Sequence, residues 1–260
     1  MNASMVVVGL IVGLCVGMTG VGGSSLTAPI LLLVFGVSPA IAVGTDIIYS
    51  VPTKILGTFV HWRKKTIDLR AVALLSAGGL PGVLVGLLIF AAARGRYDTK
   101  SLDALIRHGV GIALLVAAAA LVFSSIIRAR SPEREKDEPV VWGGSLQARM
   151  IAIGFVVGIA VSLTSIGAGS LTLPLLYLIG PRLGLRRFVG SDIAFAAIIL
   201  PFAAVGHFSM GNISIPVATS LLAGSIPGVY VGSQLAGSMP ERILRPVVAV
   251  VLVAAGSRLF

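Results

Sequence analysis

The chain has 260 residues, of which 56% are hydrophobic and only 12% are charged. Soluble domains carry about 25% charged residues, so this composition excludes a soluble fold, which would lack the polar residues to cover its surface. The net charge of +10 does not indicate nucleic-acid binding, because the basic residues lie mainly in short loops between apolar segments, where they set orientation in a membrane.

In chain order, the sequence contains two sets of four apolar blocks, several of which reach the ~20 residues needed to cross a bilayer. The blocks span 4–36, 39–61, 68–93 and 103–128 in the first half, and 148–180, 188–208, 214–237 and 242–259 in the second. Residues 129–147 lie between the halves and carry mixed charges unsuited to a membrane interior. We therefore expect an all-α polytopic membrane protein with a first repeat at 1–128, a linker at 129–147 and a second repeat at 148–260.

The two halves are copies of one sequence pattern. Residues 9–34 align with 154–179 at an offset of 145, and twelve of the 26 positions are identical, among them Gly22 and Gly167. After one inserted residue the alignment continues at an offset of 146. A repeat of this length indicates duplication of a whole half-domain, which in apolar proteins is typical of transporters.

The first block of each half is too long for one membrane helix. Each is interrupted near its middle by glycine, serine and threonine, at 19–25 and at 164–170. Glycine weakens a helix, while serine and threonine cap a helix that restarts. Each block is therefore either a re-entrant hairpin with its tip inside the membrane or two short, tilted spans.

Loop charges indicate that the two halves have opposite orientations. Loop 62–67 carries three basic residues, whereas its counterpart 209–213 carries none. Loop 36–39 is uncharged, whereas its counterpart 181–187 carries three arginines. Because basic loops favour the cytoplasm, the halves are predicted to be inverted relative to each other.

This inversion predicts a complete topology. Loops 62–67, 129–147, 181–187 and 238–242 would be cytoplasmic, and both termini would lie outside. Loop 94–102 is an exception to the charge rule, because it would be external and yet carries Arg94, Arg96 and Lys100.

The two interruptions predict a binding site for an anion. A helix that restarts within the membrane directs unpaired N–H groups and its positive end into the gap, and hydroxyls add donors. The alternative is that these small residues only allow close helix packing. The candidate binding residues of the two interruptions are Thr19, Gly20, Gly22, Gly23, Ser24, Ser25, Thr164, Ser165, Gly167, Gly169 and Ser170.

Glycines recur every four residues in the third block of each half, which places them on one helix face. They are Gly78, Gly82 and Gly86, and Gly224, Gly228 and Gly232. Close helix packing is the favoured interpretation. The alternative is a hinge, since Pro81 and Pro227 lie within these segments and tend to bend a helix.

Five ionisable residues lie in or near the second blocks. Lys54 has an apolar counterpart, Leu200, and is either a charge of the substrate site or a side chain that snorkels to the interface. Asp46 and Asp192 begin these blocks, as helix N-caps or as carboxylates that take up protons. His61 and His207 end them, as interfacial residues or as proton relays.

The repeated patterns resemble those of the TauE/SafE sulfite exporter family, also called the toluene-sulfonate uptake permease family. They are Thr-x-x-Gly-x-x-Ser-Leu-Thr-x-Pro at 19–29 and 164–174, and Gly-x-x-Pro-Gly-x-x-x-Gly at 78–86 and 224–232. The resemblance implies an inner-membrane carrier of small sulfur-containing anions such as sulfite, sulfoacetate or other organosulfonates.

The predicted function is therefore secondary transport, as an exporter, with the anion bound at the tips of both interrupted blocks. The expected partners are the anion, membrane lipid and a coupling proton or sodium ion, with no cofactor, metal or nucleic acid. The sequence contains no phosphate-binding Walker motif, so it does not indicate transport driven directly by ATP. An anion channel and a membrane-embedded enzyme are the alternatives; the enzyme would need a catalytic cluster that is not evident.

Overall fold

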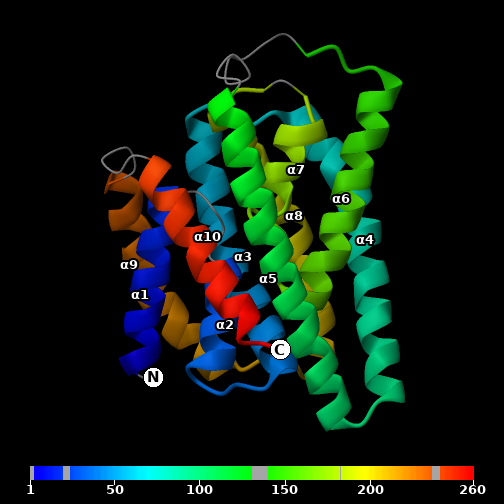
Figure 1. Cartoon of the computed structure of the whole chain (residues 1–260), viewed down its shortest axis with the longest axis vertical. Coiled ribbons are helices and arrows are strands. Elements are labelled where there is room, and N and C mark those ends of the chain that lie inside the picture. Colours follow the sequence, from blue (N-terminus) through cyan, green and yellow to red (C-terminus); the bar gives the residue numbers. More distant parts are fainter. Residues whose placement is uncertain (1–2, 20–23, 131–139, 182, 236–240) are drawn as a thin grey trace.

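The computed structural model describes residues 3–19, 24–130, 140–181, 183–235 and 241–260. These residues form ten α-helices, most of which run roughly along the long axis of the molecule (Figure 1). The helices are α1 Ala3–Thr19, α2 Ser24–Leu33, α3 Pro39–Arg63, α4 Leu69–Arg96, α5 Thr99–Arg130, α6 Gly144–Thr164, α7 Thr172–Ile179, α8 Leu185–Ser209, α9 Ile215–Leu235 and α10 Glu241–Ser257. The all-helical prediction is confirmed.

Five of the described helices are long and apolar enough to cross a membrane. The spans lie at Leu69–Arg96, Thr99–Phe123, Gly144–Thr164, Arg187–Ser209 and Ile215–Gly232. Large apolar side chains project outward from them, such as Leu88, Val205 and Tyr230, each about two-thirds exposed. Such a surface is stable in a hydrocarbon solvent and not in water.

The first block of each half forms two helices, as its interruption predicted. The second helix of each pair is short: α2 has 10 residues and α7 has 8. At 1.5 Å per residue they extend about 15 and 12 Å, roughly half of the ~30 Å hydrocarbon core. Neither is long enough to span it.

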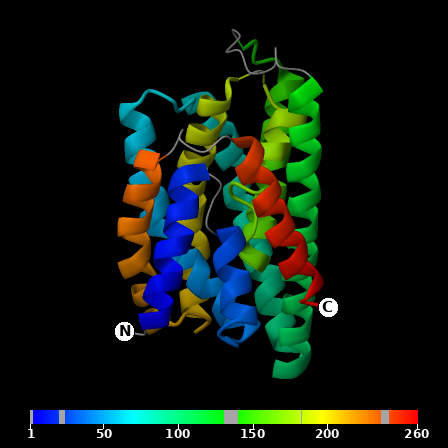
Figure 2. The same ribbon diagram turned by 60° about the vertical axis from the view of Figure 1, so that its left-hand side comes forward.

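Each short helix returns toward the end of the molecule where its long partner began. In the second half, Arg149 on the first turns of α6 donates to the carbonyl oxygen of Ile179 at the end of α7, at 3.5 Å. In the first half, α2 runs back beside α1 (Figure 2). In both halves the short helix therefore runs back alongside its long partner (Figure 2).

The regularly spaced glycines bring two helix pairs into backbone contact. Helix α1 packs along α9, and α4 packs along α6. A β-carbon at Gly78 would overlap the carbonyl oxygen of Ile151, and one at Gly224 would overlap that of Val6. The packing interpretation of these glycines is therefore confirmed.

These contacts recur at equivalent positions of the two halves. Gly82 meets the Phe155 carbonyl as Gly228 meets that of Leu10. In the other direction, Gly154 meets the Leu75 carbonyl as Gly9 meets that of Leu221. In both pairs the first long helix of one half therefore packs against the glycine helix of the other half.

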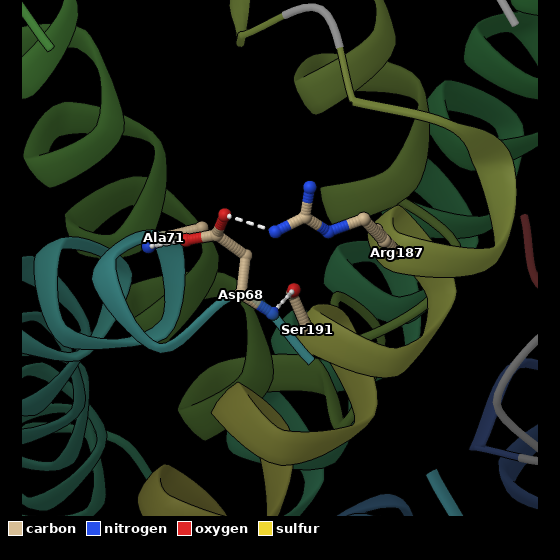
Figure 3. A network of polar contacts seen from close by, with 4 residues as sticks. All are labelled: Asp68, Ala71, Arg187 and Ser191. Carbon is tan, nitrogen blue, oxygen red and sulfur yellow. Dashed lines mark hydrogen bonds and ion pairs between the residues drawn. The ribbon is translucent and has the colours of Figure 1, made fainter. Parts of the chain in front are cut away.

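Helices α3 and α8 contact each other, and a loop from the opposite half covers the first turns of each. The Ser214 backbone N–H donates to Thr45 Oγ1 on α3 at 2.9 Å. At the other end of the molecule, the Asp68 backbone N–H donates to Ser191 Oγ on α8, also at 2.9 Å (Figure 3). We call these the Asn212 end and the Asp68 end, after residues of loops 210–214 and 64–68.

Described residues of three segments predicted to be cytoplasmic lie at the Asp68 end. Arg187 at the start of α8 forms an ion pair with Asp68 in loop 64–68, and Arg70 lies over the ring of Trp142, which precedes α6. Loop 180–184 is also there, because it leads into α8. The described parts of these segments lie at one end, as predicted, while residues 131–139, 182 and 238–240 lie outside the described residues.

Loop 94–102, which is basic although it is predicted to be external, lies at the Asn212 end. Helix α4 extends to Arg96 and α5 begins at Thr99, so most of the predicted loop 94–102 is helical. Arg94 donates to the Met210 carbonyl oxygen and, at 3.5 Å, to Asn212 Oδ1. The Arg94 charge therefore stabilises the C-terminal end of α8, a favourable place for a cation.

Candidate functional site

The interruption between α6 and α7 forms a buried, irregular segment. Helix α6 ends at Thr164, and Ser165 adopts a left-handed conformation with φ of 64°. Gly169 has φ of 93°, which is readily accessible only to glycine. Residues 164–172 are all buried, so the polar groups of this segment depend on protein partners.

Two of those partners are aspartates from different halves. The Ser165 hydroxyl donates to Asp46 Oδ2 on α3. The Gly169 backbone N–H donates to Asp192 Oδ1 on α8 at 3.1 Å. The segment between α6 and α7 is therefore bonded to both carboxylates.

The N-cap interpretation of Asp46 and Asp192 is wrong. Helix α3 begins at Pro39 and α8 at Leu185, so each aspartate lies two turns inside its helix. Both side chains are fully buried. Two buried carboxyl groups are costly to retain, which makes them candidates for a functional role.

Two threonines also contact these carboxylates and were not predicted as site residues. Thr27 on α2 interacts with Asp46, and Thr172 at the start of α7 interacts with Asp192. The Thr172 hydroxyl also donates to the Gly167 carbonyl oxygen at 3.1 Å. Thr27 and Thr172 occupy equivalent positions of the two repeats. The presence of threonine at this position in both repeats is the sequence signal that could have identified them as site residues.

Lys54 lies close to the same carboxylates. Its side chain is only 6% exposed, and its ammonium group interacts electrostatically with Asp192 and Asp46. This position is buried, unlike the interfacial position that snorkelling would give. Among the described residues, no hydrogen bond or direct ion pair engages the ammonium nitrogen.

Three polar atoms near this segment lack a hydrogen-bond partner within the described structure. They are Asp46 Oδ1, Asp192 Oδ2 and Ser170 Oγ. An unsatisfied buried polar atom costs about 1–3 kcal/mol, so such atoms are rare without a function. Together with the Lys54 ammonium, they are free to bind a ligand.

The remaining candidates of the second interruption have internal roles. The Thr164 hydroxyl donates to the Ala160 carbonyl oxygen at 2.7 Å and accepts from the Ile166 N–H at 3.2 Å. At Gly167, a β-carbon would come within 2.7 Å of the Val161 side chain. Thr164 and Gly167 therefore stabilise the conformation of this segment through contacts within the protein.

The two histidines have different surroundings. His207 is fully buried, donates from Nε2 to the Ser162 carbonyl oxygen at 2.8 Å and packs edge-on against Phe90. His61 is partly exposed at the end of α3, where Nδ1 lies 2.7 Å from Thr66 Oγ1. Neither histidine bonds to the aspartates or to Lys54.

The side chains of the first interruption, at 19–25, lie outside the described part of the structure. Gly20, Gly22 and Gly23 fall in the gap between α1 and α2, and the side chains of Thr19, Ser24 and Ser25 are not described. Their assignment to the site stays a prediction.

Comparison with known proteins identifies the class of protein to which this chain belongs. A protein of B. subtilis (strain 168) named probable membrane transporter protein YjnA is 37% identical, over 100% of both chains. YunE of the same organism, also named a probable membrane transporter protein, is 25% identical over 98% of this chain and 96% of its own. A probable membrane transporter protein of Methanocaldococcus jannaschii is 25% identical over 92% of this chain and 86% of its own.

These similarities, with the five spans, define a multi-pass membrane transporter and not an enzyme. Residues 5–259 match the family described as sulfite exporter TauE/SafE. The chain belongs to this family, which confirms the resemblance seen in the repeated motifs.

Proposed function

We propose that the protein is a secondary transporter that exports small sulfur-containing anions, such as sulfite, sulfoacetate or other organosulfonates. The description of its family as sulfite exporters supports this substrate class. The proposed location is the cell membrane, the inner membrane where a cell has two.

The proposed anion site lies between the two interrupted blocks, beside Lys54. The observation that carries this proposal is the position of Lys54: its side chain is only 6% exposed and interacts electrostatically with Asp192 and Asp46, and no hydrogen bond or direct ion pair is recorded for its ammonium group in the described structure. A charge in the interior of a membrane protein costs several kcal/mol, and a bound anion beside Lys54 would lower that cost. The Ser170 hydroxyl supplies a donor without a recorded partner, and Ser25, its counterpart in the repeat alignment, is proposed as a donor from the first half together with Ser24.

The two halves, 1–128 and 148–260, are proposed to be inverted repeats joined by the linker 129–147. Two observations support this. Contacts such as Gly78 with Ile151 and Gly224 with Val6 occur at equivalent positions of the two halves. In Figure 1, α1 runs from the lower to the upper part of the molecule, and α6 runs the other way. Inverted repeats allow a central site to face each side in turn.

The Asp68 end is proposed to face the cytoplasm, with both termini outside. Lys64 and Lys65 in loop 64–68 and Arg187 at the start of α8 support this orientation, because basic residues are retained on the cytoplasmic side. The bonding of Arg94 to the Met210 carbonyl gives a structural reason for one basic residue on the other side.

Ligand-dependent thermal stability tests the substrate class and the site together. Purified protein is heated with sulfite, sulfoacetate, taurine, sulfate or thiosulfate, since a ligand stabilises the state that it binds. We expect at least one sulfur oxyanion to raise the unfolding temperature, and Lys54→Gln to weaken its affinity about tenfold or more. Lys100→Gln, at an exposed position, is the matched control and should leave affinity unchanged. Stabilisation by none of these anions, or equal affinity of Lys54→Gln and the unaltered protein, would contradict the proposal.

A further inference from the structure

Two of the described donors predicted for the substrate, the Ser165 hydroxyl and the Gly169 N–H, are already used by the protein, whereas the Ser170 hydroxyl is not. The sequence predicts that the hydroxyls and N–H groups of 164–170 bind an anion. In the structure, the Ser165 hydroxyl donates to Asp46 and the Gly169 N–H donates to Asp192. The two carboxylates thus occupy the places that an anionic substrate would take.

The charges of the cluster lead to the same conclusion. With Asp46 and Asp192 both ionised, Lys54 neutralises one of the two, and the buried cluster keeps one net negative charge. A bound sulfonate would add a second negative charge in the same small volume. Because charges are weakly screened in the protein interior, this state is strongly unfavourable unless protons bind.

Few other ionisable groups face this cluster in the described structure. Tyr49 interacts with Asp46 from the same helix, and His61 interacts with Lys54. From α2, α6, α7 and the segment between α6 and α7, the recorded contacts to the carboxylates come from hydroxyls and a backbone N–H: Thr27, Ser165, Thr172 and Gly169. Lys54 is therefore the only described cation recorded as interacting with both carboxylates, and it cannot offset a third negative charge.

We infer that Asp46 and Asp192 are internal anions that hold the substrate's donors until they take up protons, so that anion binding draws protons from solution. This inference rests on the proposed anion site. A proton on either carboxyl group weakens its hold on the donor from Ser165 or Gly169. It also leaves Lys54 free to pair with the substrate. Each proton adds to one carboxylate oxygen, with no other bond formed or broken.

The arrangement assigns equivalent roles to equivalent residues. Asp46 and Asp192 occupy matching positions of the repeats, each contacts the threonine of its own half, Thr27 or Thr172, and each has one oxygen without a partner in the described structure. The free oxygens, Asp46 Oδ1 and Asp192 Oδ2, are where a proton can add without breaking a recorded hydrogen bond.

Calorimetry of anion binding in two buffers measures the protons taken up. Methanesulfonate is the probe, because sulfite itself changes its protonation near neutral pH. Imidazole and Tris are the buffers, because many common alternatives are themselves sulfonates. Purified unaltered protein is titrated at the same pH in each buffer, and the difference in heat gives the proton count.

We expect an uptake of one to two protons per anion bound. The affinity for the anion should then fall about tenfold for each unit by which the pH rises and for each proton taken up. Asp46→Asn and Asp192→Asn keep a side-chain oxygen as an acceptor, and each should lower the uptake by about one proton where its carboxylate takes one up. Asp103→Asn, on α5, is the matched control and should keep the full uptake.

Binding without proton uptake by the unaltered protein would overturn the inference while leaving the anion site intact. So would full uptake by both folded variants. Absence of methanesulfonate binding, together with absence of stabilisation by every anion of the thermal panel, would instead overturn the proposed function. The proton uptake of the unaltered protein tests the inference even if a variant fails to fold.

Discussion

Arg187 and Asp68 form an ion pair between helix α8 and loop 64–68, with 3.1 Å between the guanidinium nitrogen and the carboxylate oxygen (Figure 3). Asp68 Oδ1 also accepts from the Ala71 N–H and so caps α4. At the opposite end, the equivalent positions hold Ile41 and Ser214, so the equivalent loop lacks this ion pair.

The two roles of Asp68 can be separated by substitution. Asp68→Asn removes the charge and keeps a capping oxygen, whereas Asp68→Ala removes both. Because the Arg187 side chain is 36% exposed, we expect Asp68→Asn to cost about 0.5–1 kcal/mol of stability. Asp68→Ala should cost about 1 kcal/mol more through loss of the cap. Thermal unfolding in detergent checks this, and equal losses for both variants would contradict the separation of roles.

Close packing of α1 against α9 predicts an unusual response to alanine. In a helix, Gly→Ala commonly stabilises by up to about 1 kcal/mol. At Gly224, however, the added carbon would overlap the Val6 carbonyl oxygen, so Gly224→Ala should destabilise or prevent folding. Gly95, which has nothing within 4 Å of a β-carbon, is the matched control on α4. Unfolding temperatures measure both, and an unaltered or raised value for Gly224→Ala would exclude the close contact.

Much of this architecture could be predicted from residue patterns alone. Glycine spacing at 78–86 and 224–232 identified packed faces, because that spacing depends on helix geometry only. The role of Asp46 was predicted less well: Ser38 and Pro39 form a typical helix start that matches the predicted block 39–61, so the N-cap interpretation of Asp46, two turns further on, was wrong. The partners of Ser165 and Gly169 could not be predicted, since they depend on how α3 and α8 pack against the segment after α6.

Ser170 offers a test that distinguishes binding from folding. Its buried hydroxyl has no partner in the described structure, so Ser170→Ala should leave stability unchanged or slightly raised. If the hydroxyl donates to the substrate, the same variant should bind the anion several-fold more weakly, on the scale of about 1 kcal/mol for one hydrogen bond. Unfolding temperature and binding titration are measured on the same preparation. Unaltered affinity would remove Ser170 from the site.

Both interruptions are predicted to contact the same anion. Gly22→Leu and Gly167→Leu should each abolish anion binding in preparations that fold, because each introduces a bulky side chain at a tip of the proposed site; a side chain at Gly167 also meets Val161, so folding is verified first. Gly95→Leu, at an open position, controls for the substitution itself. Size-exclusion profiles verify folding. Normal binding by both folded variants would show that the two interruptions do not form one site.

The central claim is carrier-mediated transport of a sulfur oxyanion, and counterflow in proteoliposomes tests it most directly. Vesicles loaded with unlabelled sulfite or sulfoacetate are diluted into trace labelled anion of the same kind. A carrier predicts transient accumulation of label above equilibrium, a rate that saturates with concentration, and loss of both in Lys54→Gln. Flux without counterflow or saturation would indicate a channel, and no protein-dependent flux of any tested sulfur anion would contradict the proposed substrate class.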